Sequence, residues 1–586
     1  MSRSSRLLCL AGRFTIYCAA AVTLWQTSYA AESATTLRRP VAIAASGDNQ
    51  RLLVANRESG SVSVIDVATK RVIAEHAVGS RLSDLAAVPG TVRFLAADEA
   101  AHELLLLEAK GDSLSVSQRL PISPYPVTIC ISADGKQASI ASLWSRRLTF
   151  VEIGATLAVK QVMDLPFAPR TQLLLTGRDR LIVADSFGGR LALIEPSTHK
   201  LIATRDFPGH NARGLGVSPD GKMLIVSHQM LNELAHSIRN DIHWGLLMSN
   251  DLRWLEVESV LAGGKNLYQG AHMHPLGEAG RGGGDPGAVA VAGDGTVCVA
   301  ISGVNEVAVG KEGDFSMYRI DVGRRPTAVR IAADGKMAYV ANTLDDSISV
   351  IDLREREVAA TIQLGPQPQL SQAQQGELLF YDARISHDGW MSCHSCHTDG
   401  HANGQMNDNF SDRSFGAPKR VLSLLGVRDT LPLAWNGGVL TLERQINTSV
   451  EKTMQREDPL PRDQVKAIAA YMKTLDPPPS LDVLRGTQDT AAVERGRQVF
   501  AKQDCARCHA APTFTTPETY DVGLKDSQGN TEFNPPSLRG LSHRSPFLHD
   551  NRAASLEEVF LKHAHPSDTT YTADEVKDLA AYLRSL

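Results

Sequence analysis

Hydrophobic and polar residues alternate in short runs over the first two thirds of the chain, and these runs recur with a fixed period. Residues 38–79 align with residues 324–365 without a gap, and each copy holds four alternating runs separated by turn signals such as Asp334-Gly335. This is the pattern of a four-stranded antiparallel meander. Weaker copies begin near residues 80, 123, 168, 211 and 285. Seven units of about 42 residues predict an all-β, seven-bladed β-propeller over residues 38–366.

The first and last copies read LLVAN…SVSVID and AYVAN…SISVID, which resembles the YVTN family of seven-bladed propellers. That resemblance implies the fold and a binding platform, and it implies little about chemistry. A long insertion at residues 227–287 interrupts one blade. Its histidines are His228, His236, His243, His272 and His274. Imidazole is a common metal ligand, but these spacings match no known metal site, so we interpret the insertion as a docking surface for a neighbouring domain.

After residue 366 the pattern changes to helical spacing. The segment VKDLAAYLRSL at 576–586 places apolar residues at i, i+3, i+4 and i+7, and Thr572 with Glu575 forms a capping-box start. The same segment occurs earlier as VKAIAAYMKTL at 465–475. The repetition predicts two all-α domains in series, at residues 371–478 and 491–586, joined by a proline-rich segment.

Each of these repeats contains one C-x-x-C-H motif. Two thiols three residues apart can each form a thioether to one haem, and the adjacent histidine then reaches the iron. A zinc ribbon would need two more cysteines near each pair, and a thioredoxin-type pair would not need the histidine. The sequence therefore predicts two cytochrome c domains with two covalently bound haem c groups, iron ligated by the two histidines. The attachment residues are Cys393, Cys396, His397, Cys505, Cys508 and His509.

Composition and the first residues change the picture in two ways. The chain has 586 residues, 43% hydrophobic and 21% charged, with a formal net charge of -5, which indicates a globular protein and disfavours a nucleic-acid partner.

Arg3, Arg6 and Arg13 precede an apolar run and the sequence SYA. This pattern is typical of a secretory signal, here residues 1–30 with cleavage after Ala30, and it predicts a periplasmic protein without a later membrane span. Cys130 and Cys298 lie in apolar strand-like runs and are expected to be buried thiols.

Two longer segments carry a resemblance to a known family. GELLFYDARISHDGWMSCHSCH and FNPPSLRGLSHRSPFLHDNRAASLEEVF are similar to the signature segments of the bacterial di-haem cytochrome c peroxidase and MauG superfamily. The resemblance implies that hydrogen peroxide reacts at the haem on His397 and that the haem on His509 supplies electrons. Within WNGGVLTLERQ, it assigns Trp435 to an electron relay between the haems and Gln445 to the distal pocket. The family's acid–base glutamate is replaced by Gln455, so another acid such as Glu451 would have to act.

The same resemblance implies the distal ligands. For the second haem it points to His563, with His565 as the competitor, and two histidine ligands would close that iron to substrate. For the first haem, Arg413 stands where the family sometimes has a histidine. His401, Met406 and Met454 remain alternatives at that iron. A calcium ion between the domains is disfavoured, because Arg420 replaces the matching asparagine.

These features predict a periplasmic di-haem oxidoreductase that reduces hydrogen peroxide or, like MauG, oxidises a partner protein. Its electrons would come from a small soluble donor or from a protein docked on the propeller. The alternative is an electron-transfer cytochrome without peroxide chemistry, in which the propeller docks a partner dehydrogenase. A third hypothesis places a catalytic metal of its own in the histidine-rich insertion.

Overall fold

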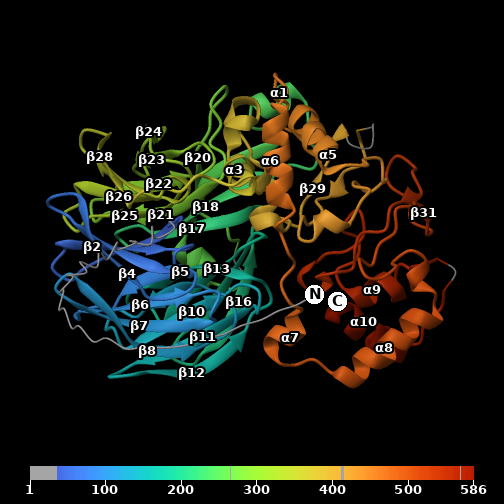
Figure 1. Cartoon of the computed structure of the whole chain (residues 1–586), viewed down its shortest axis with the longest axis horizontal. Coiled ribbons are helices and arrows are strands. Elements are labelled where there is room, and N and C mark those ends of the chain that lie inside the picture. Colours follow the sequence, from blue (N-terminus) through green and yellow to red (C-terminus); the bar gives the residue numbers. More distant parts are fainter. Residues whose placement is uncertain (1–35, 264–265, 411–414, 568) are drawn as a thin grey trace, which may run out of the picture. The chain divides into compact units, whose positions relative to one another are not determined.

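The computed structural model describes residues 36–263, 266–410, 415–567 and 569–586 (Figure 1). The expected signal segment, residues 1–30, lies outside the described residues. Within the ranges just given, no helix combines the length and the apolar character that crossing a membrane requires.

Seven four-stranded antiparallel sheets follow one another along the described chain, and each is built from four consecutive strands. The first four blades are β1 (Pro40–Ala45), β2 (Arg51–Asn56), β3 (Ser61–Asp66), β4 (Arg71–Ala77); β5 (Leu82–Ala87), β6 (Arg93–Asp98), β7 (Glu103–Lys110), β8 (Ser113–Pro121); β9 (Pro126–Ile131), β10 (Gln137–Ser142), β11 (Arg147–Ile153), β12 (Leu157–Asp164); and β13 (Pro169–Leu175), β14 (Arg180–Asp185), β15 (Arg190–Glu195), β16 (Lys200–Asp206). The other three are β17 (His210–Val217), β18 (Met223–Leu231), β19 (Met248–Glu256), β20 (His272–Pro275); β21 (Pro286–Val291), β22 (Val297–Ile301), β23 (Glu306–Gly310), β24 (Tyr318–Asp321); and β25 (Pro326–Ile331), β26 (Met337–Asn342), β27 (Ser347–Asp352), β28 (Glu357–Gln363). The predicted seven-bladed propeller is confirmed.

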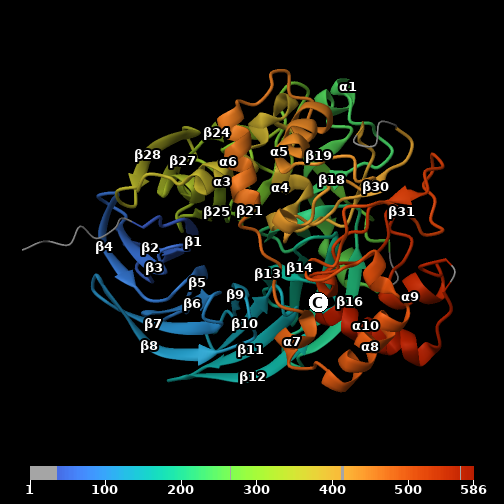
Figure 2. The same cartoon turned by 45° about the vertical axis from the view of Figure 1, so that its right-hand side comes forward.

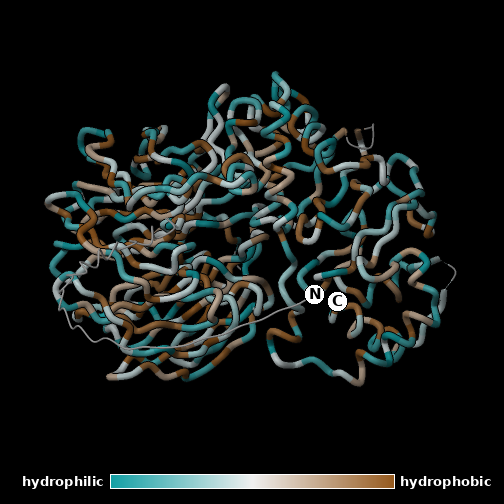
Figure 3. The backbone as a smooth tube through the Cα atoms, in the orientation of Figure 1, coloured by the Kyte–Doolittle hydropathy of each residue, from teal (hydrophilic) through white to brown (hydrophobic). Residues whose placement is uncertain are grey.

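Burial along each blade follows from how the blades pack. The middle strands, such as β2 and β3, are buried over nearly their whole length, because neighbouring blades cover both faces. The outermost strand β4 instead alternates between exposed and partly buried residues, as expected for the edge of a sheet. Figure 3 shows the corresponding mixture of hydrophobic and hydrophilic stretches along the propeller strands.

Buried aspartates join neighbouring blades. Asp98, at the end of β6, accepts hydrogen bonds from the backbone N–H groups of Ser80 and Arg81 at 2.6 and 3.1 Å. Asp346 accepts in the same way from the N–H groups of Arg38 and Arg39 at 2.9 and 2.7 Å. The second contact joins the last blade to the start of the first, so it closes the ring without any exchange of strands.

The histidine-rich insertion extends the fifth blade. It contains the helices α1 (Arg239–His243) and α2 (Val257–Leu261), between and after the long strands β18 and β19. Its backbone reaches the first haem-motif domain, since the N–H groups of Gly282 and Gly284 donate to the carbonyls of Asp388 and Gly389 at 2.6 and 3.1 Å.

The C-terminal region contains two similar helix pairs. Its helices are α3 (Gln372–Phe380), α4 (Cys393–Cys396), α5 (Leu442–Thr448), α6 (Arg462–Met472), α7 (Leu481–Arg485), α8 (Thr490–Lys502), α9 (Leu556–Leu561) and α10 (Ala573–Ser585). Figures 1 and 2 both place α3 beside α6 and α8 beside α10. A glycine allows the close crossing in each pair, because a Cβ on Gly376 or Gly496 would lie 1.9 Å from the carbonyl oxygen of Ala467 or Asp578, respectively.

The two C-terminal domains are not purely α-helical, which differs from the prediction. Two short antiparallel ladders occur there, β29 (Met406–Asn407) with β30 (Lys419–Arg420), and β31 (Tyr520–Asp521) with β32 (Glu532–Phe533). Long irregular segments carry these ladders between the helices, and they supply many of the residues that line the cavities described below.

Asp346→Ala and Asp98→Ala form a matched test of ring closure, because both carboxylates are fully buried and accept backbone N–H groups, two at Asp346 and three at Asp98. Each change should cost about 1–3 kcal/mol of stability for the unpaired donors, measured as a shift in the denaturant midpoint. Limited proteolysis should release the first blade faster only in Asp346→Ala, since Asp98 joins blades that are already consecutive in the chain. Equal cleavage of the two variants would contradict this account of closure.

Candidate haem-binding sites

The first C-x-x-C-H motif lies on the wall of a cavity of about 250 Å³. Cys393 and Cys396 occupy the single turn of α4, and His397 follows directly. The Nδ1–H of His397 donates to the carbonyl oxygen of Leu422 at 2.9 Å, which leaves Nε2 as the free lone pair. Burial lowers the pKa of His397 to about 4, so the ring is neutral and able to ligate a metal.

The second motif repeats this arrangement on a cavity of about 620 Å³. Cys505, Cys508 and His509 all line it, and the Nδ1–H of His509 donates to the carbonyl oxygen of Phe514 at 3.2 Å. Burial, and after it the nearby His565, lower the pKa of His509 to about 4. Both motif histidines therefore present the same tautomer, oriented by a backbone carbonyl, as a proximal iron ligand requires.

The thiols do not have the character of a redox-active pair. Burial raises the pKa of Cys393 and of Cys396 to about 12 and that of Cys505 to about 11. A redox-active pair needs an accessible thiolate. All the cysteines in the described part of the chain are free, including Cys130 and the fully buried Cys298.

One wall is shared by the two cavities. Trp435, Arg420 and Arg544 line both of them. The indole N–H of Trp435 donates to the carbonyl oxygen of Arg420 at 2.9 Å, and its own carbonyl accepts from the N–H of Asn534 at 2.7 Å. Backbone contacts on both sides thus fix the tryptophan between the two C-x-x-C-H sites, where the sequence resemblance puts the relay.

The two arginines of this wall provide a test of whether the cavities suit haem. Burial lowers the pKa of Arg420 and of Arg544 to about 10. Neither guanidinium forms an ion pair with a carboxylate of the described residues, and the Nε of Arg420 has no hydrogen-bond partner among them. A buried cation is costly unless an anion compensates it. The propionate groups of haem would supply such anions, so the residues present fit the cofactor.

The structure separates the candidates for the distal side of the first cavity. Gln445 and Met454 line it. The Nε2 of Gln445 donates to the hydroxyl of Ser449 at 3.1 Å, and its Oε1 is buried without a partner in the described chain. Glu451 is exposed on the π-helix Ser449–Thr453 and does not line the cavity.

The remaining candidates for that side lie elsewhere. The Nε2 of Gln455 donates to the carbonyl oxygen of Ser237 in the insertion at 2.9 Å. Both ring nitrogens of His401 have partners, and neither His401 nor Met406 lines the cavity. Arg413 lies outside the described residues. Among the described residues that line the first cavity there is no aspartate or glutamate.

On the second cavity the structure favours the competing histidine. His565 lines the cavity and its Nδ1 is buried without a partner among the described residues. His563 does not line it, and its Nε2 instead donates to the carbonyl oxygen of Arg552 at 3.1 Å. The expectation for His563 therefore has no geometric support. Helix α9 ends at Leu561, and Ala564 has a φ of 45°, which turns the chain so that His565 faces inward.

Sequence reasoning missed two contributors to the sites. His549 is 2% exposed, lines the second cavity, stacks on Phe533 at 4.5 Å and meets Trp435 edge-on at 6.2 Å. Asp285, in the propeller, accepts hydrogen bonds from the hydroxyls of Ser392 and Ser395 at 2.5 and 2.6 Å. His549 lies within the family-like segment FNPPSLRGLSHRSPFLHDNRAASLEEVF, so the sequence could have indicated it. No sequence pattern links Asp285 to serines more than 100 positions away.

The propeller thus forms part of the first site. The two serines flank Cys393, and His210 of β17 also donates its Nε2–H to the carbonyl oxygen of Ser395 at 3.0 Å. Burial raises the pKa of Asp285, and the donating serine hydroxyls oppose that shift.

Asp285→Ala is expected to remove the acceptor for both serine hydroxyls and to cost about 1–3 kcal/mol of stability. Hydrogen exchange of residues 389–397 should become faster, because the turn that carries the thiols loses its anchor. The matched control is Asp294→Ala on the same blade, since Asp294 is largely exposed and pairs only with Lys311 and Thr296. Unchanged exchange in Asp285→Ala would contradict the anchoring role.

Comparison with known proteins gives a consistent result. Residues 371–476 match the family described as di-haem cytochrome c peroxidase, and residues 493–586 match cytochrome c. The methylamine utilization protein MauG of Methylorubrum extorquens is 27% identical over 234 residues, which are 31% of this chain and 66% of that protein. The cytochrome c551 peroxidase of Nitrosomonas europaea is 24% identical over 264 residues, covering 36% of this chain and 79% of that protein.

Among solved structures, the hydrazine synthase of Kuenenia stuttgartiensis matches with a TM-score of 0.49 at 19% identity, over 55% of this chain and 98% of that one. The chain spans about two thirds or more of the length of the two curated relatives named above. Residues 371–586 therefore resemble di-haem cytochrome c peroxidases and MauG, which indicates a di-haem, peroxidase-like oxidoreductase joined to a seven-bladed β-propeller.

Proposed function

We propose that the protein is a periplasmic di-haem c-type oxidoreductase in which the first cavity takes hydrogen peroxide and the second transfers electrons. The observation that carries this proposal is the position of Trp435 in a wall common to two cavities that each contain a C-x-x-C-H motif. The signal-like pattern of residues 1–30 supports export. Electrons would come from a small soluble donor or from a partner protein docked on the propeller.

The chain offers a complete set of residues for two haem groups. Cys393 and Cys396 would hold one through thioethers, with His397 as ligand, and Cys505, Cys508 and His509 would hold the other. When bound, these groups would supply redox-active iron that can react with a small oxidant. Arg420 and Arg544 would neutralise the propionates between them, and His565 would fill the distal side of the second site.

Gln445 is the polar group suited to orient peroxide in the first cavity. Ser449 holds its Nε2, so the free Oε1 can accept a hydrogen bond from a peroxide O–H. Reduction of peroxide to two waters also needs two electrons and two protons, and an amide does not deliver protons. Because Glu451 and Gln455 point away and no described carboxylate lines the cavity, protons would have to arrive through water, and turnover should be slow for this family.

One observation favours the alternative of electron transfer without peroxide chemistry. Met454 is 4% exposed and its side chain lies among the residues that line the first cavity. A thioether ligand at that iron would close it, as in cytochromes that only carry electrons. The same cavity then has no access for an oxidant, and the propeller would dock the partner that exchanges electrons.

The deciding experiment is the spectrum of the ferric holoprotein before and after one equivalent of hydrogen peroxide. An open first site gives a high-spin component that peroxide abolishes, and Gln445→Leu should slow that change about 100- to 1,000-fold, in the range typical of a single positioned polar group. Two low-spin haems that do not respond to peroxide would overturn the peroxidase proposal. Recovery of a peroxide response in Met454→Ala would then identify Met454 as the blocking ligand.

The distal ligand of the second site gives a separate prediction. His565→Ala should convert one low-spin haem to high spin and raise its reduction potential, because a strong imidazole donor is lost. His563→Ala is the matched control, two positions away, and should leave the spectrum unchanged. Electron paramagnetic resonance of the ferric protein distinguishes these outcomes. A spin change in His563→Ala alone would restore the ligand expected from the sequence.

A further inference from the structure

The five histidines of the insertion do not form one site. His228 accepts from the Nε–H of Arg253 at 3.0 Å, and His274 uses both ring nitrogens, with Trp254 and with the carbonyl oxygen of Asp314. His236 stacks on Phe415 at 4.7 Å. Each of these side chains has a partner of its own, so a metal bound by the insertion alone has no support.

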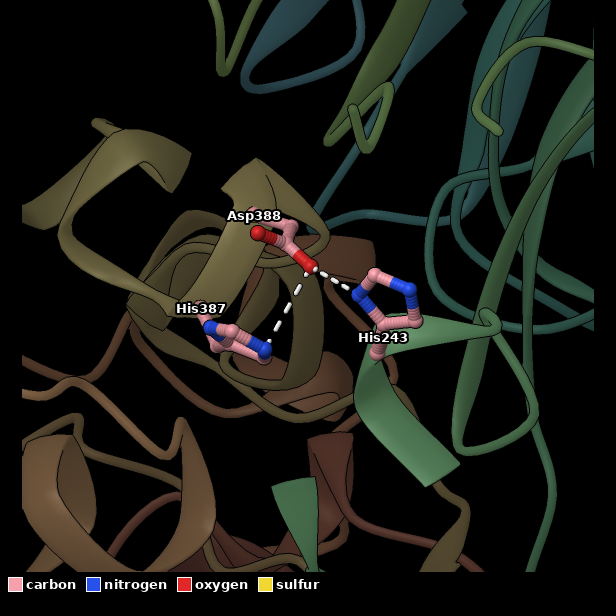
Figure 4. Close-up of side chains that lie close together, drawn as sticks. All are labelled: His243, His387 and Asp388. Atoms are coloured by element: carbon pink, nitrogen blue, oxygen red, sulfur yellow. Dashed lines mark hydrogen bonds and ion pairs between the residues drawn. The ribbon is translucent and has the colours of Figure 1, made fainter. Parts of the chain in front are cut away.

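His243 is different, because it meets two residues of the first haem-motif domain. Its Nδ1 lies 2.7 Å from Oδ2 of Asp388, and Nε2 of His387 lies 3.3 Å from the same oxygen. One ligand atom from each of the three residues lies within 4.8 Å of the others. Figure 4 shows the carboxylate between the two rings, with His243 coming from α1 and the other two residues from the segment before α4.

The backbone fixes this cluster from both sides. The carbonyl oxygen of Asp388, a residue with φ of 57°, accepts from the N–H of Gly282 in the insertion at 2.6 Å. The N–H of His387 donates to the carbonyl oxygen of Met454 at 2.9 Å. The side chains remain accessible, with 39% of His243, 13% of His387 and 19% of Asp388 exposed. An ion could therefore reach a donor set whose main chains are already held.

We propose that His243, His387 and Asp388 bind a divalent transition-metal ion of the zinc type, which clips the propeller insertion to the first haem domain. Two imidazoles and one carboxylate, with water in a fourth position, are a recurrent zinc donor set. Calcium and magnesium are disfavoured, because they take oxygen ligands. Zinc ligand atoms about 2.0–2.2 Å from the ion lie about 3.3–3.6 Å apart in a tetrahedral site. In the structure the three ligand atoms lie within 4.8 Å of one another. A small movement of the more exposed His243 ring would bring them to the tetrahedral spacing.

This inference stands apart from the peroxide proposal, since none of its three residues lines either cavity. The clip would join elements that contact each other only through non-covalent bonds. It would also restrain Met454, whose backbone His387 holds and whose side chain borders the first cavity. The histidine-rich insertion then acquires a structural metal role rather than a redox role.

The test uses chelator-treated holoprotein and zinc chloride, followed by isothermal titration calorimetry and thermal unfolding. The wild-type protein should bind one equivalent of zinc, and saturating zinc should raise the unfolding temperature because the ion binds the folded state. His243→Ala and Asp388→Asn should each weaken zinc binding at least 10-fold and lose the thermal shift. Without zinc, the circular dichroism spectra of both variants should match that of the wild-type protein. A match shows that a variant has lost the zinc site and not its fold.

The matched control is His272→Ala. His272 belongs to the same insertion, is also 39% exposed and lies 3.6 Å from a single carboxylate, Glu312. This variant should keep both the zinc equivalent and the thermal shift. The inference is overturned if the wild type binds no zinc, or if His243→Ala binds zinc as tightly as the wild type does.

Discussion

The carboxylate of Asp285 is the contact on which the arrangement of the first site depends. It is a buried propeller side chain whose two oxygens accept the hydroxyls on either side of the first haem-binding cysteine. A buried carboxylate is stable only where donors of this kind surround it. The turn of α4 and the propeller wall therefore stabilise each other, and the ring of blades acts as a structural part of the haem site rather than as an appended module.

Ion pairs across the same boundary extend this dependence. Asp399, just after the first motif, accepts from both Arg170 and Arg213 of the propeller at 2.5 and 2.8 Å. These two arginines hold the pKa of Asp399 well below its usual range despite its burial. The propeller thus compensates a charge of the first C-x-x-C-H domain. Arg420 and Arg544, between the cavities, have no such carboxylate partner among the described residues, and the propionates of a bound haem would supply one.

Sequence patterns predicted those features that depend on local periodicity. The turn signals and alternating runs predicted the blades, and the duplicated helix with its C-x-x-C-H motif predicted the two cytochrome domains. Residues placed by counting along a family pattern were less secure. Counting assumes an unchanged chain path, but the turn at Ala564 brings His565 to the second cavity and leaves His563 outside it. Glu451, suggested only as a nearby acid, is exposed on the π-helix at residues 449–453. Contacts such as Asp285 with Ser392 join distant segments, and no local pattern encodes them.

Arg39 connects ring closure to the C-terminal region. Its backbone N–H contacts Asp346 of the last blade, while its guanidinium forms an ion pair with Glu377 of α3 at 2.8 Å. Helix α3 begins only a few residues after β28, so the chain reaches the haem domain as soon as the seventh blade is complete. The docking surface of α3 on the propeller therefore includes a residue of the segment that closes the ring. Ring closure and docking of the first C-x-x-C-H domain thus share one residue near the start of the described chain.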